Sequence, residues 1–408
     1  MHGRKVFLIG GLHFIVDLYA GFFAIYMVLA ELDPARSALI IAVASFVANA
    51  IQPVMGYWSD RIRGKLPVFL SVITAAVFMS SIGLTRSYLS LFGLMLIGLS
   101  AVSLFHPAGA NISVAAGLHR KERSFSLFVT IGTVGFALSQ PVFSAFTDVA
   151  GNTASVLLAV PGVALALAYL LFSRTGVSGP ERKLDLSAMA DLLRRRFATL
   201  LLLFLITVFR HGFIMSLAIF IAKIFADWGF SRFSYSTAHA VYTVGGAVGI
   251  LAAGAVAHRV RAKTMLHVSL LGFLLPFGLL MYSGQSSMLA LSFLFLAITG
   301  VFLQFSHITV VIMGHRIFPE GTATISGILM GFGWAVGRLS YPLVPLFQDA
   351  VPGVPGLSSG LIILALFPLA ASALTLLLPS ETEAPAAGFD SAAKPTAEPE
   401  ESGSRGTY

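Results

Sequence analysis

GYWSDRIRGK, at Gly56–Lys65, is the stretch that divides this chain, because GAVAHRVRAK repeats its pattern 198 residues later at Gly254–Lys263. Both copies begin with glycine, carry arginine at their sixth and eighth positions and end with lysine. Their fifth position is Asp60 in the first copy and His258 in the second. A pattern that recurs at a fixed offset predicts two homologous halves.

Long apolar segments lie on both sides of the two stretches. Of the 408 residues, 57% are hydrophobic and 11% are charged, and the mean hydropathy is +0.87. Soluble domains carry about 25% charged residues, so this composition excludes a soluble enzyme and indicates an integral membrane protein. Twelve segments are long and apolar enough to span a bilayer as helices: Val6–Ala30, Ser37–Trp58, Leu66–Thr85, Tyr88–Val114, Ser124–Thr147, Ser155–Phe172, Thr199–Ala226, Ser234–Ala257, Met265–Gly284, Ser287–Met313, Thr324–Phe347 and Leu357–Leu378. We therefore predict an all-α membrane protein with twelve transmembrane helices in two six-helix parallel repeats.

The basic residues predict the orientation. Twenty of the 26 Lys and Arg residues fall on the side of the membrane that holds the N-terminus, and four fall on the opposite side: Arg36, Arg86, Lys223 and Arg232. Because basic loops stay in the cytoplasm, we expect a multi-pass protein of the plasma (inner) membrane with both termini cytoplasmic. The formal charge of +8 is then a signal of topology, and no nucleic-acid partner is expected.

The longest cytoplasmic connection separates six helices from six. We expect an N-terminal six-helix bundle at 1–172, a cytoplasmic linker at 173–198, a C-terminal six-helix bundle at 199–378 and a disordered cytoplasmic tail at 379–408. The tail is rich in Ala, Pro, Glu and Ser and has no apolar periodicity.

Two pairs of histidines follow the repeat. His13 and His211 lie 198 residues apart, and His106 and His307 lie 201 residues apart. Halves of six helices enter the membrane from the same side, so that a ligand site is expected at their interface near the middle of the membrane. This is the architecture of a secondary transporter.

Enzyme chemistry has no support in the chain. It contains no cysteine, which excludes thiolate nucleophiles, disulfides and cysteine metal sites. The glycine runs at Val244–Gly249 and Gly331–Gly337 follow no strand and lack the lysine of a nucleotide-binding loop. We expect no enzyme activity, no cofactor and no metal, and transport driven by an ion or solute gradient.

The first repeated stretch resembles the loop that each half of the major facilitator superfamily carries, Gly-x-x-x-Asp-Arg-x-Gly-x-Lys/Arg. Four residues match this pattern: Gly56, Asp60, Arg61 and Lys65. The second glycine of the pattern lies one place late, at Gly64. The resemblance implies that these four residues form a gate, whereas the plainer interpretation is a solvated turn that helps to set topology. Because His258 replaces the acid in the second copy, only the first loop is expected to gate strongly.

Further motifs are similar to the fosmidomycin resistance protein branch of that superfamily. They are the His13-x-x-x-Asp17 spacing and the runs IQPVMGYWSDR at Ile51–Arg61, LFHPAGAN at Leu104–Asn111 and IGTVGFALSQP at Ile131–Pro141. The branch implies drug/proton antiport. It typically follows FHP with an acidic residue, which is Ala108 here, so the resemblance implies coupling through another group or no proton coupling.

Asp17 is the only acidic residue well inside an apolar segment, and His13 lies four residues earlier on the same helix face. A carboxylate in the membrane is costly and is a functional candidate by default. We interpret Asp17 and His13 as the proton-coupling pair. The alternative is a structural hydrogen bond that holds the first helix to its neighbours.

Arginine inside the membrane points to an anionic substrate. Arg210 and His211 lie midway along the seventh segment, and Arg338 lies midway along the eleventh. The guanidinium fork suits carboxylate, phosphate or phosphonate groups. We therefore predict a substrate site formed by Arg210, His211, Arg338, His106, Gln304 and His307. One alternative is that Asp17 pairs with one arginine as an internal strut, and another is that Gln304 and His307 only form hydrogen bonds between helices.

Pro107 is expected to break the fourth helix beside His106, because proline disfavours helical geometry in the residue before it. That break would free His106 for a ligand; a simple kink with His106 hydrogen-bonded to the backbone is the alternative.

Together these observations predict a secondary active transporter for proton-coupled efflux, by antiport, of a small anionic drug or organic anion, as in antibiotic resistance. One alternative is uptake or facilitated diffusion of an anionic metabolite, and an alternative of another class is a non-transporting membrane receptor or scaffold. The expected partners are the anionic substrate, protons and membrane lipid, and we expect the protein to work as a monomer.

Overall fold

The structure, a computed structural model, describes residues 2–52, 64–116, 121–173, 194, 196–307, 309–318 and 325–379. Within these ranges all the elements are helices. A helix satisfies its own backbone hydrogen bonds, which is what an apolar segment in hydrocarbon requires.

The helices before residue 173 form one group, which we call the N-terminal group. Its members are α1 (His2–Ala20), α2 (Phe22–Leu29), α3 (Pro34–Ala50), α5 (Leu66–Ser80), η1 (Ser81–Leu84), α6 (Tyr88–Ala116), α7 (Lys121–Ala150), η3 (Asn152–Leu158) and α8 (Ala159–Phe172). Local sequence sets the helix ends. For example, the Asp33 side chain accepts a hydrogen bond from the Arg36 N–H at 2.8 Å, and Pro34 takes the first position of α3.

The helices after residue 196 form the C-terminal group. Its members are α10 (Phe197–Asp227), α11 (Arg232–Val256), α12 (Ala262–Gly272), α13 (Leu274–Gln285), α14 (Leu289–Gln304), α15 (Thr309–Ile317), η5 (Gly327–Phe332), α17 (Gly333–Gly337), η6 (Arg338–Ser340), α18 (Leu343–Leu346), α19 (Leu357–Leu364) and α20 (Leu366–Leu376).

Ten helices among the described residues, some made of two consecutive elements, are long and apolar enough to cross a membrane, from Phe7–Leu29 to Leu357–Leu376. The other two predicted segments are shorter or interrupted where they are described. Ser37–Trp58 appears as α3, which has 17 residues. Thr324–Phe347 is divided into a π-helical turn and three short helices, because glycines and two prolines interrupt it.

The fourth helix runs without interruption through Pro107, so the predicted break beside His106 was wrong. The Nδ1 atom of His106 lies 2.7 Å from the Val102 carbonyl oxygen, one turn earlier in α6. The side chain thus adds a contact to the helix at the proline, in agreement with the alternative interpretation.

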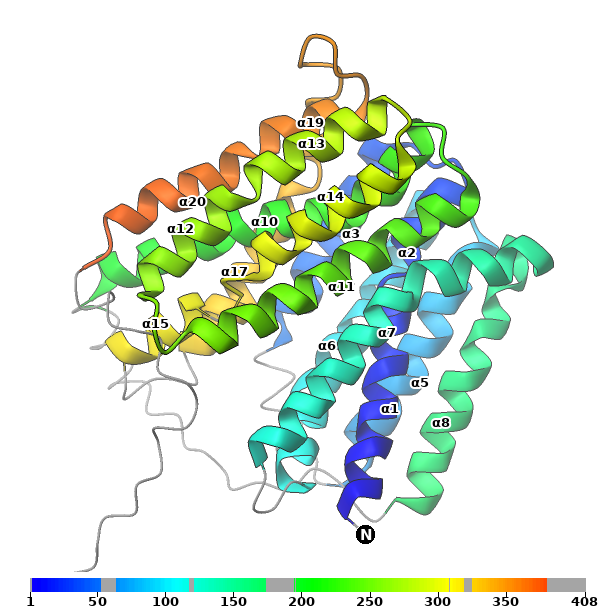
Figure 1. The fold of residues 1–408 in the computed structure, drawn as a ribbon. Coiled ribbons are helices and arrows are strands. Elements are labelled where there is room, and N and C mark those ends of the chain that lie inside the picture. Colours follow the sequence, from blue (N-terminus) through cyan, green and yellow to red (C-terminus); the bar gives the residue numbers. More distant parts are fainter. Residues whose placement is uncertain are drawn as a thin grey trace, which may run out of the picture.

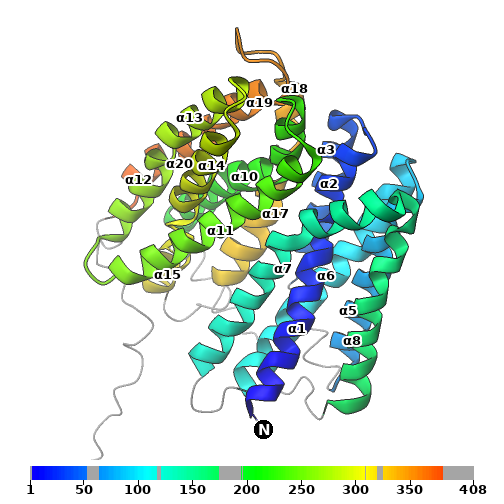
Figure 2. The same cartoon turned by 45° about the vertical axis from the view of Figure 1, so that its right-hand side comes forward.

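The two groups lie side by side, and α7 packs along α11 where they meet (Figure 1). Further contacts between the groups join α2 to α10 and α3 to α17 and η6. Toward the end of the molecule that carries the N-terminus, the ribbons of the two groups diverge, as Figures 1 and 2 both show.

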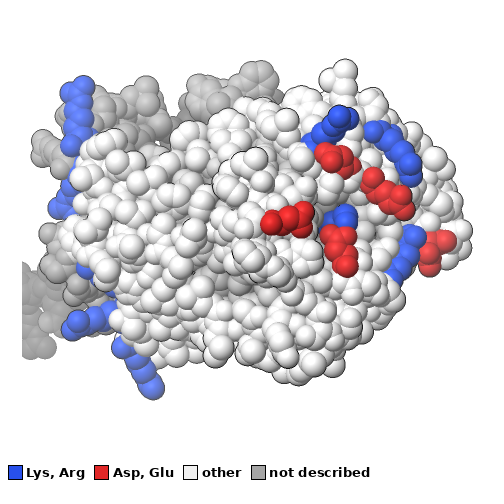
Figure 3. Space-filling model, turned by 90° about the horizontal axis from the view of Figure 1, so that it is seen from above, with Lys and Arg blue, Asp and Glu red and all other residues white. Residues whose placement is uncertain are grey.

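Charged side chains gather at the two ends of the molecule. In the view of Figure 3, acidic and basic residues lie together at one end, and only basic residues are seen at the other, beside the atoms that are not described. A wide uncharged band separates the ends, as expected for a surface that faces lipid.

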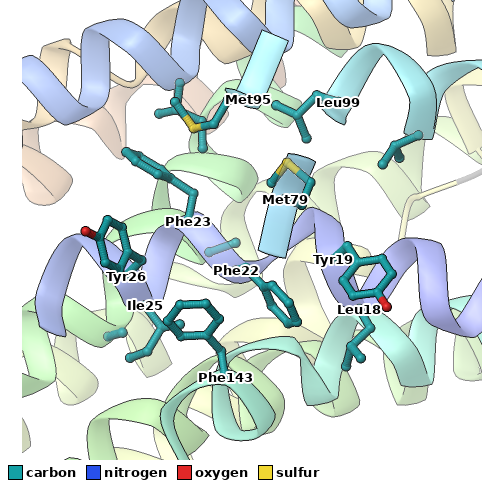
Figure 4. Close-up of a cluster of buried hydrophobic side chains, with 14 of the residues drawn as sticks. Leu18, Tyr19, Phe22, Phe23, Ile25, Tyr26, Met79, Met95, Leu99 and Phe143 are labelled. Carbon is teal, nitrogen blue, oxygen red and sulfur yellow. The ribbon is translucent and has the colours of Figure 1, made fainter. Parts of the chain in front are cut away.

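Aromatic packing holds α1 and α2 in the middle of the N-terminal group (Figure 4). Tyr19 and Phe22 are fully buried, and Phe143 of α7 lies 5.0 Å from Phe22 between ring centroids. The Tyr19 hydroxyl donates to the Leu158 carbonyl at 2.8 Å and accepts from the Gly162 N–H at 3.0 Å. These contacts determine the rotation of α1 about its axis, and therefore where His13 and Asp17 point.

Candidate functional site

A carboxylate between two imidazoles forms the polar centre of the N-terminal group. One oxygen of Asp17, Oδ2, lies 3.2 Å from Nε2 of His13 on the same helix. Its other oxygen, Oδ1, lies 3.4 Å from Nε2 of His106 on α6. The expected pair of Asp17 and His13 therefore has a third member, His106, which we had predicted for the substrate site.

The surrounding backbone holds both imidazoles in place. Nδ1 of His13 lies 2.8 Å from the carbonyl oxygen of Phe128 on α7, and the Phe128 ring stacks on the imidazole at 3.9 Å between centroids. Gly132 of α7 leaves the space for this ring, since a Cβ there would overlap the ring atoms of His13. Nδ1 of His106 is held by Val102, as described above.

Three such donors invite comparison with a metal centre. One donor atom from each of His13, Asp17 and His106 lies within 4.8 Å of the others. The two carboxylate oxygens each lie within ion-pair distance of a different imidazole, an arrangement in which protons can pass between the three side chains. We therefore interpret the cluster as one that shares protons.

Arg210 is the most enclosed cation of the C-terminal group, with 2% of its surface exposed. Its Nε donates to the Ser306 hydroxyl at 3.1 Å, and its Nη2 donates to the Leu303 carbonyl at 2.9 Å and the Gln304 side-chain oxygen at 3.3 Å. All three partners are neutral. The guanidinium is thus tied to residues 303–306, and it has no acidic partner in the part of the chain that the structure describes.

Gln304 and His307 extend this network. The Gln304 oxygen that accepts from Arg210 also lies 2.9 Å from Nδ1 of His307. Since that oxygen only accepts, His307 donates through Nδ1, and its Nε2 is left for another partner.

Trp334 joins two of the predicted histidines. The His211 ring is stacked parallel to Trp334, with 4.8 Å between centroids and 2° between planes. The His307 ring lies 5.5 Å from the same indole at 46°. Trp334 was not among the predicted residues. The signal in the sequence was its rarity, since it is one of only three tryptophans in the chain and lies among intramembrane glycines.

Close helix packing brings Arg338 to this cluster. A Cβ on Gly337 would lie 3.0 Å from the Val208 carbonyl and 3.1 Å from the Gly212 N–H, so α17 and α10 approach with almost no side chain between them. The Ser340 hydroxyl donates to the Gly212 carbonyl at 3.1 Å. The residues on either side of Arg338, Gly337 and Ser340, thus contact the helix that carries His211.

Arg338 lies between the two clusters. It begins η6, which contacts α10, the helix that carries His211, and α3 of the N-terminal group. Among the described residues, its Nε atom and Nε2 of His211 are buried without a hydrogen-bond partner. Buried polar atoms are normally satisfied, so these two have capacity for a ligand.

The structure does not support the alternative in which Asp17 pairs with an arginine. Both its carboxylate oxygens face imidazoles, and the ion pairs of the described residues include none between Asp17 and an arginine.

Three residues of the predicted gate, Gly56, Asp60 and Arg61, lie outside the described residues. The fourth, Lys65, donates from Nζ to the Leu170 carbonyl at 2.7 Å, at the end of α8. Its repeat counterpart Lys263 donates to the Leu378 carbonyl at 2.8 Å, just after α20. Each lysine thus binds the carboxyl end of the last helix in its own group, where a cation is favourable.

A polar seam joins the two groups at the end opposite the N-terminus. Arg232, at the start of α11, donates from Nη2 to the Ser144 carbonyl at 2.9 Å and to the Thr147 hydroxyl at 3.0 Å, and from Nε to the Ser144 hydroxyl at 3.2 Å. Its Nε also lies 3.3 Å from the Asp148 carboxylate. All three partners belong to α7. In the sequence, Arg232 indicated only the orientation of the chain in the membrane, because its three partners lie 84 to 88 positions away.

Proteins of two bacteria are similar to this chain. The fosmidomycin resistance protein of Escherichia coli (strain K12) is 23% identical over 320 residues, which cover 74% of this chain and 75% of that protein. The uncharacterized MFS-type transporter YfnC of Bacillus subtilis (strain 168) is 23% identical over 360 residues, covering 83% and 82%.

Solved structures share the fold. A bacterial homologue of the human lysosomal transporter Spinster, in an inward-facing and unoccupied conformation, has a TM-score of 0.73 at 16% identity and covers 93% of this chain and 97% of that one. The nucleoside transporter NupG has a TM-score of 0.74 at 16% identity, covering 92% and 98%. The predicted all-helical fold is confirmed by these likenesses. A sequence profile of the Major Facilitator Superfamily matches residues 6–342, and the chain therefore belongs to that superfamily of membrane transporters.

Proposed function

We propose that this chain is a secondary active transporter that couples the efflux of a small organic anion to proton movement in the opposite direction. The observation that carries the proposal is the separation of charge between the groups. The C-terminal group holds two arginines without an acidic partner among the described residues, and the N-terminal group holds one carboxylate between two imidazoles.

The anion site of this proposal lies around Arg338. Because three hydrogen bonds already hold Arg210 to α14, its role is to supply positive charge and to orient Gln304 and His307. Arg338, His211 and His307 then provide the direct contacts, with Nε of Arg338 and Nε2 of His211 unpartnered in the described residues. A carboxylate, phosphate or phosphonate would match the guanidinium fork. The name of the E. coli relative supports fosmidomycin as the first compound to test.

The proton site of the proposal is the pair of Asp17 and His13. An imidazole in contact with a buried carboxylate binds and releases protons with small changes of surroundings. Ala108, at the place where the branch carries an acid, leaves Asp17 as the carboxylate available for this task in the described membrane segments.

The arrangement in the membrane completes the proposal. We place both termini in the cytoplasm of a plasma (inner) membrane, with six-helix domains at 1–172 and 199–378 working as a monomer. The divergence of the two groups toward the N-terminal end then corresponds to an inward-facing state. Alternating access would require the seam at Arg232 to open.

Transport in purified vesicles tests the proposal. Wild-type protein should move fosmidomycin against its gradient when a pH step is applied, and Asp17→Asn should abolish this movement while sparing anion exchange at equal pH. Asp33→Asn is the matched control, because Asp33 is an exposed acid whose helix-capping role asparagine retains. Uphill transport by Asp17→Asn would contradict the assignment of the proton site.

Uptake or facilitated diffusion of an anionic metabolite is the second candidate, and Ala108 is the observation that favours it. If wild-type protein equilibrates the anion but never concentrates it under a pH step, that function replaces proton-coupled efflux.

A further inference from the structure

The contacts of the two imidazoles determine how many protons the cluster of Asp17, His13 and His106 can hold. Nδ1 of His13 and Nδ1 of His106 both face backbone carbonyl oxygens, at 2.8 and 2.7 Å. A carbonyl oxygen only accepts hydrogen bonds, so each Nδ1 carries a hydrogen. A neutral imidazole with hydrogen on Nδ1 has none on Nε2.

Both Nε2 atoms nevertheless lie within ion-pair distance of carboxylate oxygens, at 3.2 and 3.4 Å, although Nε2 of His13 makes no hydrogen bond there. An ionised carboxylate also only accepts, so each contact needs a proton of its own. With no added proton, two lone-pair contacts repel; with one, a single contact is satisfied; with two, both are satisfied. Both ion pairs are therefore favourable only when the cluster holds two protons beyond the two on Nδ1.

We propose that Asp17, His13 and His106 form one two-proton cluster, and that His106 is the member that exchanges protons with water. This inference rests on the proposed proton coupling and assigns His106 to the proton path instead of the substrate site.

Exposure distinguishes the three members. The side chain of His106 is 36% exposed, against 16% for Asp17 and 5% for His13. The rings of Phe105 and Phe128 and the backbone at Gly132 enclose His13, and none of these groups titrates. Water therefore reaches the cluster through His106.

A proton path follows from this order. A proton carried by water bonds to Nε2 of His106, and its transfer to Oδ1 of Asp17 breaks that N–H bond and returns His106 to its neutral form. Rotation of the carboxyl group about its Cβ–Cγ bond then presents the proton to Nε2 of His13. His106 can now accept the second proton.

Among the described residues, Arg338 is the charged group of the other half that acts on His106. Since Arg338 also belongs to the proposed anion site, a bound anion changes the charge near His106, which links the occupancy of the anion site to that of the proton cluster.

Chemical rescue tests the role of His106. His106→Ala should lower pH-driven transport in vesicles by about 100-fold or more, the range for loss of a proton-transfer group. Added imidazole should restore a large part of it, because the vacated position is open to water. His13→Ala is the matched control: it removes an imidazole from the same carboxylate at a closed position, and imidazole should not restore its activity.

Each outcome decides a separate point. A wild-type rate in His106→Ala would overturn the proposed proton path through His106. A loss of activity that imidazole does not restore, and that extends equally to anion exchange at equal pH, would also overturn it. His106→Gln has a polar side chain that does not titrate. It should retain anion exchange, which shows that the protein is folded. If it also keeps wild-type pH-driven transport, the proton path through His106 is overturned. Failure of the proposed proton coupling would appear instead as wild-type protein that does not respond to a pH step.

Discussion

Removal of the Arg232 side chain should open the seam between α7 and α11. In Arg232→Ala, the hydrogen bonds to Ser144 and Thr147 and the ion pair with Asp148 are all lost. Every one of these contacts crosses from the C-terminal to the N-terminal group. The substitution therefore destabilises the state in which the groups touch at this end, and the hydrogen bonds and ion pair it removes all join the two groups.

The size of the effect follows from exposure. Arg232 is 35% exposed and Asp148 is 63% exposed, so their ion pair contributes at most about 0.2–1 kcal/mol. Three hydrogen bonds from a partly exposed donor add about 0.5 kcal/mol each, at the low end of the usual range. The sum is about 2 kcal/mol, which changes the ratio of open to closed seams by about 30-fold. A molecule with a seam open about 1% of the time would then be open about a quarter of the time.

Distance measurements between two spin labels can detect this change. The chain has no cysteine, so Val149→Cys on α7 and Phe233→Cys on α11, both exposed positions beside the seam, would carry the only labels. Arg232→Ala should shift the distribution of distances toward longer values.

Lys223→Ala provides the control, because Lys223 pairs with Asp227 within α10 at the same end of the molecule. It should leave the distances unchanged. An unchanged distribution in Arg232→Ala, or an equal shift in Lys223→Ala, would refute the reasoning.

Three further predictions concern the site and the topology. Arg338→Gln should weaken anion binding with little loss of stability. Arg210→Gln should also lower the melting temperature, because it leaves buried acceptors unpaired, at a cost of about 1–3 kcal/mol. Binding assays and thermal unfolding distinguish the two variants, and equal behaviour would contradict this prediction. Gly132→Ala should impair pH-driven transport and cost about 1–3 kcal/mol, because its Cβ would overlap the imidazole beside Asp17, while Gly93→Ala, with open space around it, should be tolerated in the same assays. Reporters fused after Lys263 and at the C-terminus should both score cytoplasmic, and an external C-terminus would contradict the twelve-helix topology.

The helical membrane fold follows from the sequence alone. Long apolar segments have few alternatives in a bilayer, since each must satisfy its own backbone groups, and the repeat at Gly56–Lys65 and Gly254–Lys263 indicates two halves. The contact of His13 with Asp17 was also predictable, because residues four apart on a helix are neighbours by geometry alone.

Which distant polar groups meet depends on the tertiary structure. His106 reaches Asp17 from another helix, Arg210 is tied to Ser306, and Trp334 stacks on His211. The physical reason is that lipid and protein interior are equally apolar, so that composition does not distinguish the face of a membrane helix that meets lipid from the face that meets another helix. Rotation and depth of each helix depend instead on close packing, as at Gly132 beside His13 and Gly337 beside Gly212, and that packing is a property of the assembled bundle.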